Sequence, residues 1–131
     1  MPVATMMRRT VLGAALAMGL AGAALAQGAD DLSGTYQVQG QNPGSGQGTY
    51  GADITVKMVG EVYQLTWASG DQQAVGSGLR LGDTFAVTWQ DPKSKESAIA
   101  VYIIMPDGGL KGRWAPLGAE SAGTEDWTRK P

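Results

Sequence analysis

The sequence predicts an all-β domain, an eight-stranded antiparallel up-and-down barrel, and three observations carry this prediction. Eight runs of alternating apolar and polar residues follow one another and are separated by glycine-containing turns. No segment of ten residues has the 3.6-residue period of an amphipathic helix. Glycine supplies 20 of the 131 residues, about twice its usual share, which is typical of tight turns between short strands.

Each expected strand turns one apolar face toward a core and one polar face toward water. The strands cover residues 34–40, 49–59, 62–68, 73–81, 84–90, 98–105, 110–115 and 123–129. In the first three strands the inward residues are Tyr36 and Val38, then Tyr50, Ala52, Ile54, Val56 and Met58, then Tyr63, Leu65 and Trp67. In the fifth and seventh they are Phe85, Val87 and Trp89, and Leu110 and Trp114.

The links between these runs have the length of hairpin turns. They favour an up-and-down antiparallel barrel over a sandwich, because a sandwich needs longer crossover connections. Such a barrel would resemble those of the calycins and avidins. A flattened barrel or a β-sandwich is the alternative architecture. Eight-stranded barrels are either packed solid with side chains or hold one small ligand, and the sequence leaves both options open.

The first 26 residues have the pattern of an export signal. Arg8 and Arg9 end a basic region, an apolar run follows, and residues 24–26 form an A-x-A site, so we expect cleavage before Gln27. The arginine pair leaves both the general secretory and the twin-arginine route open. The remaining 105 residues would form a single periplasmic or secreted domain with eight basic and twelve acidic side chains and no stable membrane span.

The amino-acid composition limits which catalytic groups and metal ligands this domain can have. The chain has no cysteine and no histidine, which excludes a disulfide framework, a thiol nucleophile, an imidazole base and a Cys/His zinc site. Asp30 and Asp31 precede the first strand, and Glu125 and Asp126 point to opposite faces of the last, so no carboxylate pair suits acid–base catalysis. We therefore expect neither an enzyme nor a bound cofactor or metal, and the weakly acidic charge argues against nucleic acid as a partner.

Glycines, aromatics and turn residues recur in a characteristic order along the domain. They are Gly34, Tyr36, Val38, Gly40, Asn42, Pro43, Tyr50, Gly51, Trp67, Gly76, Gly78, Tyr102, Asp107, Gly108, Leu110, Gly112, Trp114, Gly123, Thr124 and Glu125. Their spacing resembles a family of small exported bacterial proteins often labelled fibronectin-binding protein. Members of that family carry cysteines in the middle strands, which this chain lacks. The resemblance implies adhesion to host matrix such as fibronectin.

Strand direction predicts how the barrel closes. The first strand begins and the eighth ends at the same rim, so Tyr36 and Arg129 should be neighbours across the seam, both with inward parity. We expect the Arg129 side chain to lie over the Tyr36 ring in a cation–π contact. Glu125 also has inward parity, and a buried carboxylate needs partners; we expect it to bond to loop amides.

The sixth run, residues 98–105, is apolar on both faces. A barrel wall has one interior, so either the odd-numbered or the even-numbered residues must face outward and need a cover. We expect a homodimer through this strand. The alternative is a local cover by a loop or by residues 30–33.

Strand direction also predicts a candidate site. Trp67, Trp89 and Trp114 end odd-numbered strands and Tyr50 opens the second, so these four aromatics should converge at one rim. The links at that rim, residues 41–48, 69–72, 91–97 and 116–122, are expected to be longer than the links 60–61, 82–83 and 106–109 opposite. The aromatics form either a packed barrel end or the floor of a binding mouth. In a mouth, hydrogen bonds would come from Asn42, Ser45, Gln47, Ser69, Asp71 and Gln72.

Three function classes fit these observations. The first is an exported, non-enzymatic module that binds a protein or polymer outside the cytoplasm. The second is a small-ligand barrel, and the third is a structural envelope protein.

Overall fold

The computed structural model describes residues 31–44, 46 and 48–131, and the part from Leu32 to Pro131 forms one compact unit. The expected export signal, residues 1–26, lies outside the described residues. The strands are β1 (Gly34–Gln41), β2 (Thr49–Val59), β3 (Val62–Ser69), β4 (Gln72–Leu81), β5 (Thr84–Gln90), β6 (Ser97–Ile104), β7 (Leu110–Pro116) and β8 (Gly123–Arg129). In this part of the chain there is no helix with the length and apolar character that crossing a bilayer requires.

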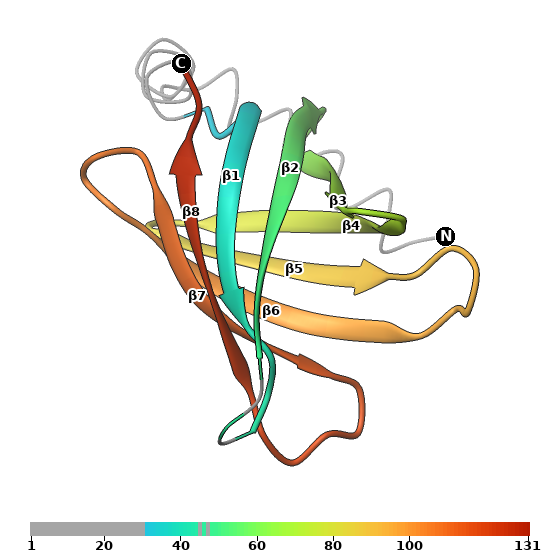
Figure 1. Cartoon of the computed structure of the whole chain (residues 1–131). Helices are drawn as coiled ribbons and strands as arrows, with labels where there is room; N and C mark the ends of the chain where they lie inside the picture. The colour runs from blue at the N-terminus through green and yellow to red at the C-terminus, as the bar shows by residue number, and fades with distance from the viewer. Residues whose placement is uncertain (1–30, 45, 47) are drawn as a thin grey trace, which may run out of the picture. The chain divides into compact units, whose positions relative to one another are not determined.

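The eight strands form a closed barrel. Each strand pairs antiparallel with the next, and β8 pairs with β1 beside it (Figure 1). The up-and-down barrel is therefore confirmed, and the sandwich alternative is wrong. The predicted strand ends differ from the observed ones by no more than one residue, because alternation in burial follows alternation in the sequence; β5, for example, buries every second residue from Phe85 to Trp89.

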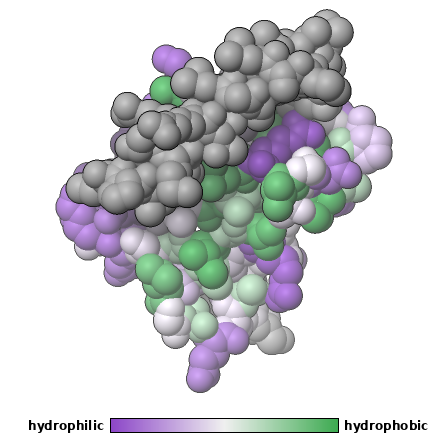
Figure 2. Space-filling model, turned by 180° about the vertical axis from the view of Figure 1, so that it is seen from behind, coloured by the Kyte–Doolittle hydropathy of each residue, from purple (hydrophilic) through white to green (hydrophobic). Residues whose placement is uncertain are grey.

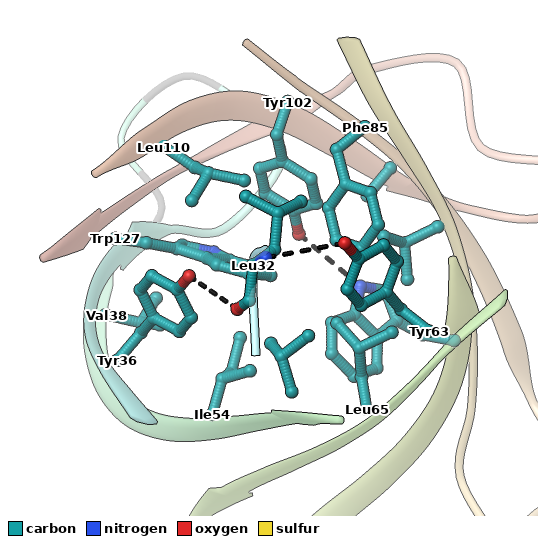
Figure 3. Packing of buried hydrophobic residues seen from close by; sticks show 14 of the residues in the cluster. Leu32, Tyr36, Val38, Ile54, Tyr63, Leu65, Phe85, Tyr102, Leu110 and Trp127 are labelled. Atoms are coloured by element: carbon teal, nitrogen blue, oxygen red, sulfur yellow. Dashed lines mark hydrogen bonds between the residues drawn. The ribbon is translucent and has the colours of Figure 1, made fainter. Parts of the chain in front are cut away.

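Large apolar side chains fill the barrel at the rim where β1 begins. Tyr36, Tyr63, Phe85 and Trp127 are almost fully buried there, and neighbouring ring centroids lie 5.4–6.4 Å apart. Leu32, just before β1, lies in the middle of this ring of aromatics (Figure 3). Its carbonyl accepts a hydrogen bond from the Tyr36 hydroxyl at 2.7 Å, and its amide donates one to the Tyr63 hydroxyl at 3.4 Å. Leu32 thus closes this end of the barrel.

The seam between β1 and β8 brings the two predicted neighbours, Tyr36 and Arg129, together. Tyr36 pairs with Arg129, and the guanidinium carbon of Arg129 lies 5.5 Å from the centroid of the Tyr36 ring, within the range of a cation–π contact. The guanidinium also donates a hydrogen bond to the carbonyl of Ser33. The predicted contact between Tyr36 and Arg129 is therefore present, and it joins the last strand to the segment that precedes the first.

Several glycines lie inside strands, directly opposite aromatic side chains. The opposed pairs are Gly40 and Tyr50, Gly76 and Trp89, Gly112 and Tyr102, and Gly123 and Trp114. A Cβ on any of these glycines would come within 2.9 Å of an atom of the paired aromatic side chain. Turns therefore account for only part of the glycine content. The other part makes room for rings that lie across the neighbouring strand.

The outer face of β6 is apolar. Ile99, Val101 and Ile103 are 54%, 46% and 49% exposed, while the even-numbered residues of the strand face the interior. Ala86 of β5 pairs with Val101, and Leu79 of β4 pairs with Ala86, so the apolar outer surface extends over three strands. Figure 2 shows apolar side chains gathered on the face seen from behind. Of the alternative cover, residues 30–33, residue 30 lies outside the described residues. Leu32 and Ser33 do not cover this face, because Leu32 packs inside the barrel and the Ser33 hydroxyl accepts a hydrogen bond from the Met58 amide.

Candidate ligand-binding site

A pocket of about 420 Å³ occupies the barrel rim opposite Leu32, and we call it the mouth. The strands β2 to β8 contribute to it, together with the loop between β5 and β6. Its walls are formed by Tyr50, Trp67, Trp89 and Trp114, its carboxylates are Asp91, Glu96 and Glu125, and its other lining residues are Asn42, Ser69, Gln72, Gln73, Ala74, Ser97, Ala98 and Pro116. The barrel is thus filled at one end and open at the other.

The Tyr50 ring stands at a steep angle to two other aromatic walls, Trp67 and Trp114. The Tyr50 ring lies 5.9 Å from the Trp67 ring at 66° and 6.2 Å from the Trp114 ring at 79°. All three are only partly buried and line the mouth, so part of each side chain can contact a ligand. Trp89 is more deeply placed, and its indole N–H lies 3.4 Å from the Tyr102 hydroxyl. Rigid rings of this kind offer a large apolar contact area at a small cost in conformational entropy.

Glu125, on β8, lies at the floor of the mouth and is only 4% exposed. Its carboxylate accepts hydrogen bonds from the hydroxyls of Tyr50 at 2.6 Å and Tyr102 at 2.7 Å, and from the Trp127 indole at 3.1 Å. The expected bond to loop amides is wrong: the partners come from β2, β6 and β8 itself. Because hydrogen bonds to a charged group are stronger than neutral ones, this network fixes Tyr50 and Tyr102 in position.

The two tyrosines stay protonated under ordinary conditions. Burial, followed by the negative charge of Glu125, raises the pKa of Tyr50 and that of Tyr102 well above the usual value for tyrosine. Both hydroxyls therefore act as hydrogen-bond donors to Glu125. The Trp114 indole nitrogen is buried with no hydrogen-bond partner among the described residues.

The polar rim is partly held in place by the backbone. Asn42 closes the loop between β1 and β2 by donating two hydrogen bonds to the Gly48 carbonyl, from its amide at 3.0 Å and from its side chain at 3.1 Å. Ser69 donates to the Gly51 carbonyl at 2.6 Å. Asp91 accepts hydrogen bonds from the amides of Lys93 and Ser94, which lower the pKa of its carboxyl group. These hydrogen bonds therefore hold Asn42, Ser69 and Asp91 in place at the rim.

The structure brings together most of the residues that the sequence proposed for the mouth. Tyr50, Trp67, Trp89, Trp114, Asn42, Ser69 and Gln72 all line it. Ser45 and Gln47 lie outside the described residues. Asp71 does not line the mouth: the β3–β4 link is a two-residue turn with Gly70 at φ +59, so Asp71 stays exposed at its tip. The expectation of a longer link there is wrong for the same reason.

Sequence reasoning missed the carboxylates of the mouth. Asp91 and Glu96 belong to a loop that was correctly placed at this rim, so their position in the sequence could have identified them. Glu125 was assigned the correct face but the wrong role. Among the residues that the structure describes, these acidic groups do not cluster as metal ligands.

Comparisons with known proteins give no family for this chain. No family model matches it, and no curated protein matches it. Among solved structures it is similar to secretory abundant heat soluble protein 4 from Ramazzottius varieornatus, with 9% sequence identity and a TM-score of 0.47. That similarity covers 78% of this chain and 96% of the other.

Proposed function

We propose that this protein is a non-catalytic binding protein whose mouth holds a small ligand, or a small group that projects from a larger partner. The observation that carries the proposal is the pocket of about 420 Å³ that four aromatic side chains line together with a buried carboxylate, Glu125. Pockets of this size, mostly apolar and with a few fixed polar groups, are typical of small-molecule sites. Between the sequence-based alternatives, the pocket favours the small-ligand barrel.

Binding to a protein or polymer outside the cytoplasm fits the same mouth when a side chain or a sugar enters it. Such a partner would also contact the ordered loop between β5 and β6 and the Asn42 loop. Fibronectin, suggested by the resemblance of the sequence, is one partner to test. Function outside the cytoplasm rests on the signal pattern in residues 1–26, and cell fractionation with an antibody to residues 32–131 tests it.

Native mass spectrometry of the protein purified from its own source tests ligand binding even while the identity of the ligand is open. We expect an additional mass that remains bound under gentle conditions and disappears in the Trp67→Ala variant, because that variant removes one wall of the mouth. Leu81→Ala is the matched control, since Leu81 is 84% exposed on the outer face. A wild-type protein without any bound mass, or an equal loss in both variants, would count against the proposal.

A further inference from the structure

The charge of the mouth indicates what class of ligand it takes. Three carboxylates line it, Asp91, Glu96 and Glu125, and no lysine or arginine does so within the described part of the chain. Lys93 and Lys95 belong to the same loop as Asp91, but neither lines the mouth. The acidic groups therefore favour a positive charge over a negative one in this pocket.

The aromatic walls favour the same kind of ligand. The face of an aromatic ring carries partial negative charge, and several rings at steep angles form a cage that attracts an alkylated ammonium group. The Tyr50 ring stands at 66° to the Trp67 ring and at 79° to the Trp114 ring, with centroids 5.9 Å and 6.2 Å away, so these three rings form walls of such a cage. An anion in the same place would face both the rings and Glu125.

The carboxylate of Glu125 adds a fixed negative charge at the floor of the mouth. Glu125 is held by three hydrogen bonds, from Tyr50, Tyr102 and Trp127, so the position of its carboxylate is fixed before any ligand enters. Two of these bonds go to Oε1 and one to Oε2, which leaves an acceptor position on Oε2, the oxygen bonded by the mouth residue Tyr50. A cation in the mouth would balance this buried negative charge.

We propose that the mouth binds a ligand with a cationic amine or quaternary ammonium group, seated among Tyr50, Trp67 and Trp114 and facing Glu125. This inference rests on the proposed function and names the chemistry of its ligand. The apolar rings solvate the alkyl groups on the nitrogen, and the carboxylates balance its charge. The volume of the mouth leaves room for further parts of the ligand beside the cationic group.

Three probes of nearly equal size and different charge test the inference at constant ionic strength. They are choline, its neutral isostere 3,3-dimethyl-1-butanol and the anion 3,3-dimethylbutanoate. Binding is followed by tryptophan fluorescence, since three of the four tryptophans line the mouth. We expect choline to bind about tenfold or more tightly than the isostere, and the anion to bind least.

Charge variants identify the source of the preference. Glu125→Gln should reduce the ratio between choline and the isostere severalfold, and Glu96→Gln should reduce it less, because Glu96 is exposed to solvent at the rim. Glu61→Gln, in the turn between β2 and β3 at the opposite rim, is the matched control and should leave the ratio unchanged. If Glu125→Gln fails to fold by circular dichroism, the combination of Glu96→Gln with Asp91→Asn takes its place.

The outcomes separate the two proposals. Equal binding of choline and the isostere, or tighter binding of the anion, would overturn the cationic ligand and leave the binding function intact. Failure of all three probes would also overturn the cationic ligand, while the bound mass in the native spectrum would decide the binding function separately. A preference for choline that survives Glu125→Gln and the double variant unchanged would overturn the assigned role of the carboxylates.

Discussion

Replacement of Gly40 by alanine tests whether the glycines inside the strands hold the mouth aromatics in place. A Cβ at residue 40 would lie 2.1 Å from Cζ of Tyr50 and 2.4 Å from its hydroxyl oxygen. Carbon atoms in contact are about 3.5–4.0 Å apart, so the Tyr50 ring must move by more than about 1 Å. The movement would break the 2.6 Å hydrogen bond from Tyr50 to Glu125.

The structure gives a magnitude for this change. Overpacking costs about 1–3 kcal/mol, and losing a hydrogen bond to a charged group costs about 1.5–3 kcal/mol. We therefore expect Gly40→Ala to reduce the free energy of unfolding by about 3–5 kcal/mol, measured by urea denaturation followed by tryptophan fluorescence. Gly51→Ala is the matched control on the outer face, where the nearest atom to the new Cβ is the Val38 carbonyl oxygen at 3.8 Å. It should be neutral or stabilising by about 0.5 kcal/mol.

A double-mutant cycle isolates the contact. In the Tyr50→Ala background the ring is gone, so Gly40→Ala should cost less than about 0.5 kcal/mol or stabilise the strand. The same cost in both backgrounds would refute the reasoning, because the clash with Tyr50 would then not be its source. A Gly40→Ala protein as stable as the wild type would refute it as well.

Three further predictions follow from the core, the tyrosines and the outer face. Leu32→Ala should reduce the free energy of unfolding, measured in urea titrations, by about 2–4 kcal/mol, because it leaves a cavity between the aromatic rings that surround Leu32. A reduction below about 1 kcal/mol would show that the Leu32 side chain is not needed to close this end of the barrel. The pKa of Tyr102 in the folded state lies above its value near 10 in the unfolded chain, so its contribution to stability is complete below about pH 10. As the pH rises further, this contribution to the free energy of unfolding falls by about 1.4 kcal/mol per pH unit. Tyr102→Phe should flatten this alkaline slope in denaturation curves between pH 9 and pH 11, and an unchanged slope would contradict the assignment. The dimer expected through residues 98–105 should appear in light scattering and dissociate in Val101→Lys, since Val101 is exposed at the centre of the apolar row; a wild-type monomer mass at high concentration would remove the dimer.

Strand positions and faces were predictable because they depend on local alternation alone. The alternation of apolar and polar residues assigned the four aromatics of the mouth to the inner face of the barrel, and the count of strands then placed them at one rim. The pairing of Tyr36 with Arg129 followed from the same count. The face that a residue occupies and the rim at which its strand ends follow from alternation and strand count, whereas the exact partner across a seam also depends on the register.

The partners of Glu125 were not predictable in this way. Tyr50, Tyr102 and Trp127 reach its carboxylate from three strands, and their heights in the barrel depend on the stagger between strands, which alternation does not encode. The glycines opposite the aromatics were missed for a related reason: each was interpreted by its own conformational freedom, while its role depends on the residue across the ladder.

The four indole N–H signals in a ¹H–¹⁵N NMR spectrum test the central claim that the mouth is a ligand site. Trp67, Trp89 and Trp114 line the mouth, and the Trp127 indole donates a hydrogen bond to Glu125 at its floor. The backbone amide of Glu61, in the turn between β2 and β3 at the opposite rim, gives a signal remote from the mouth. On titration with choline and with 3,3-dimethyl-1-butanol, we expect the indole signals of Trp67 and Trp114 to shift most and the backbone amide signal of Glu61 to stay unchanged. If neither probe moves the mouth signals more than the Glu61 amide signal, the mouth does not bind these ligands and the account of this site is wrong.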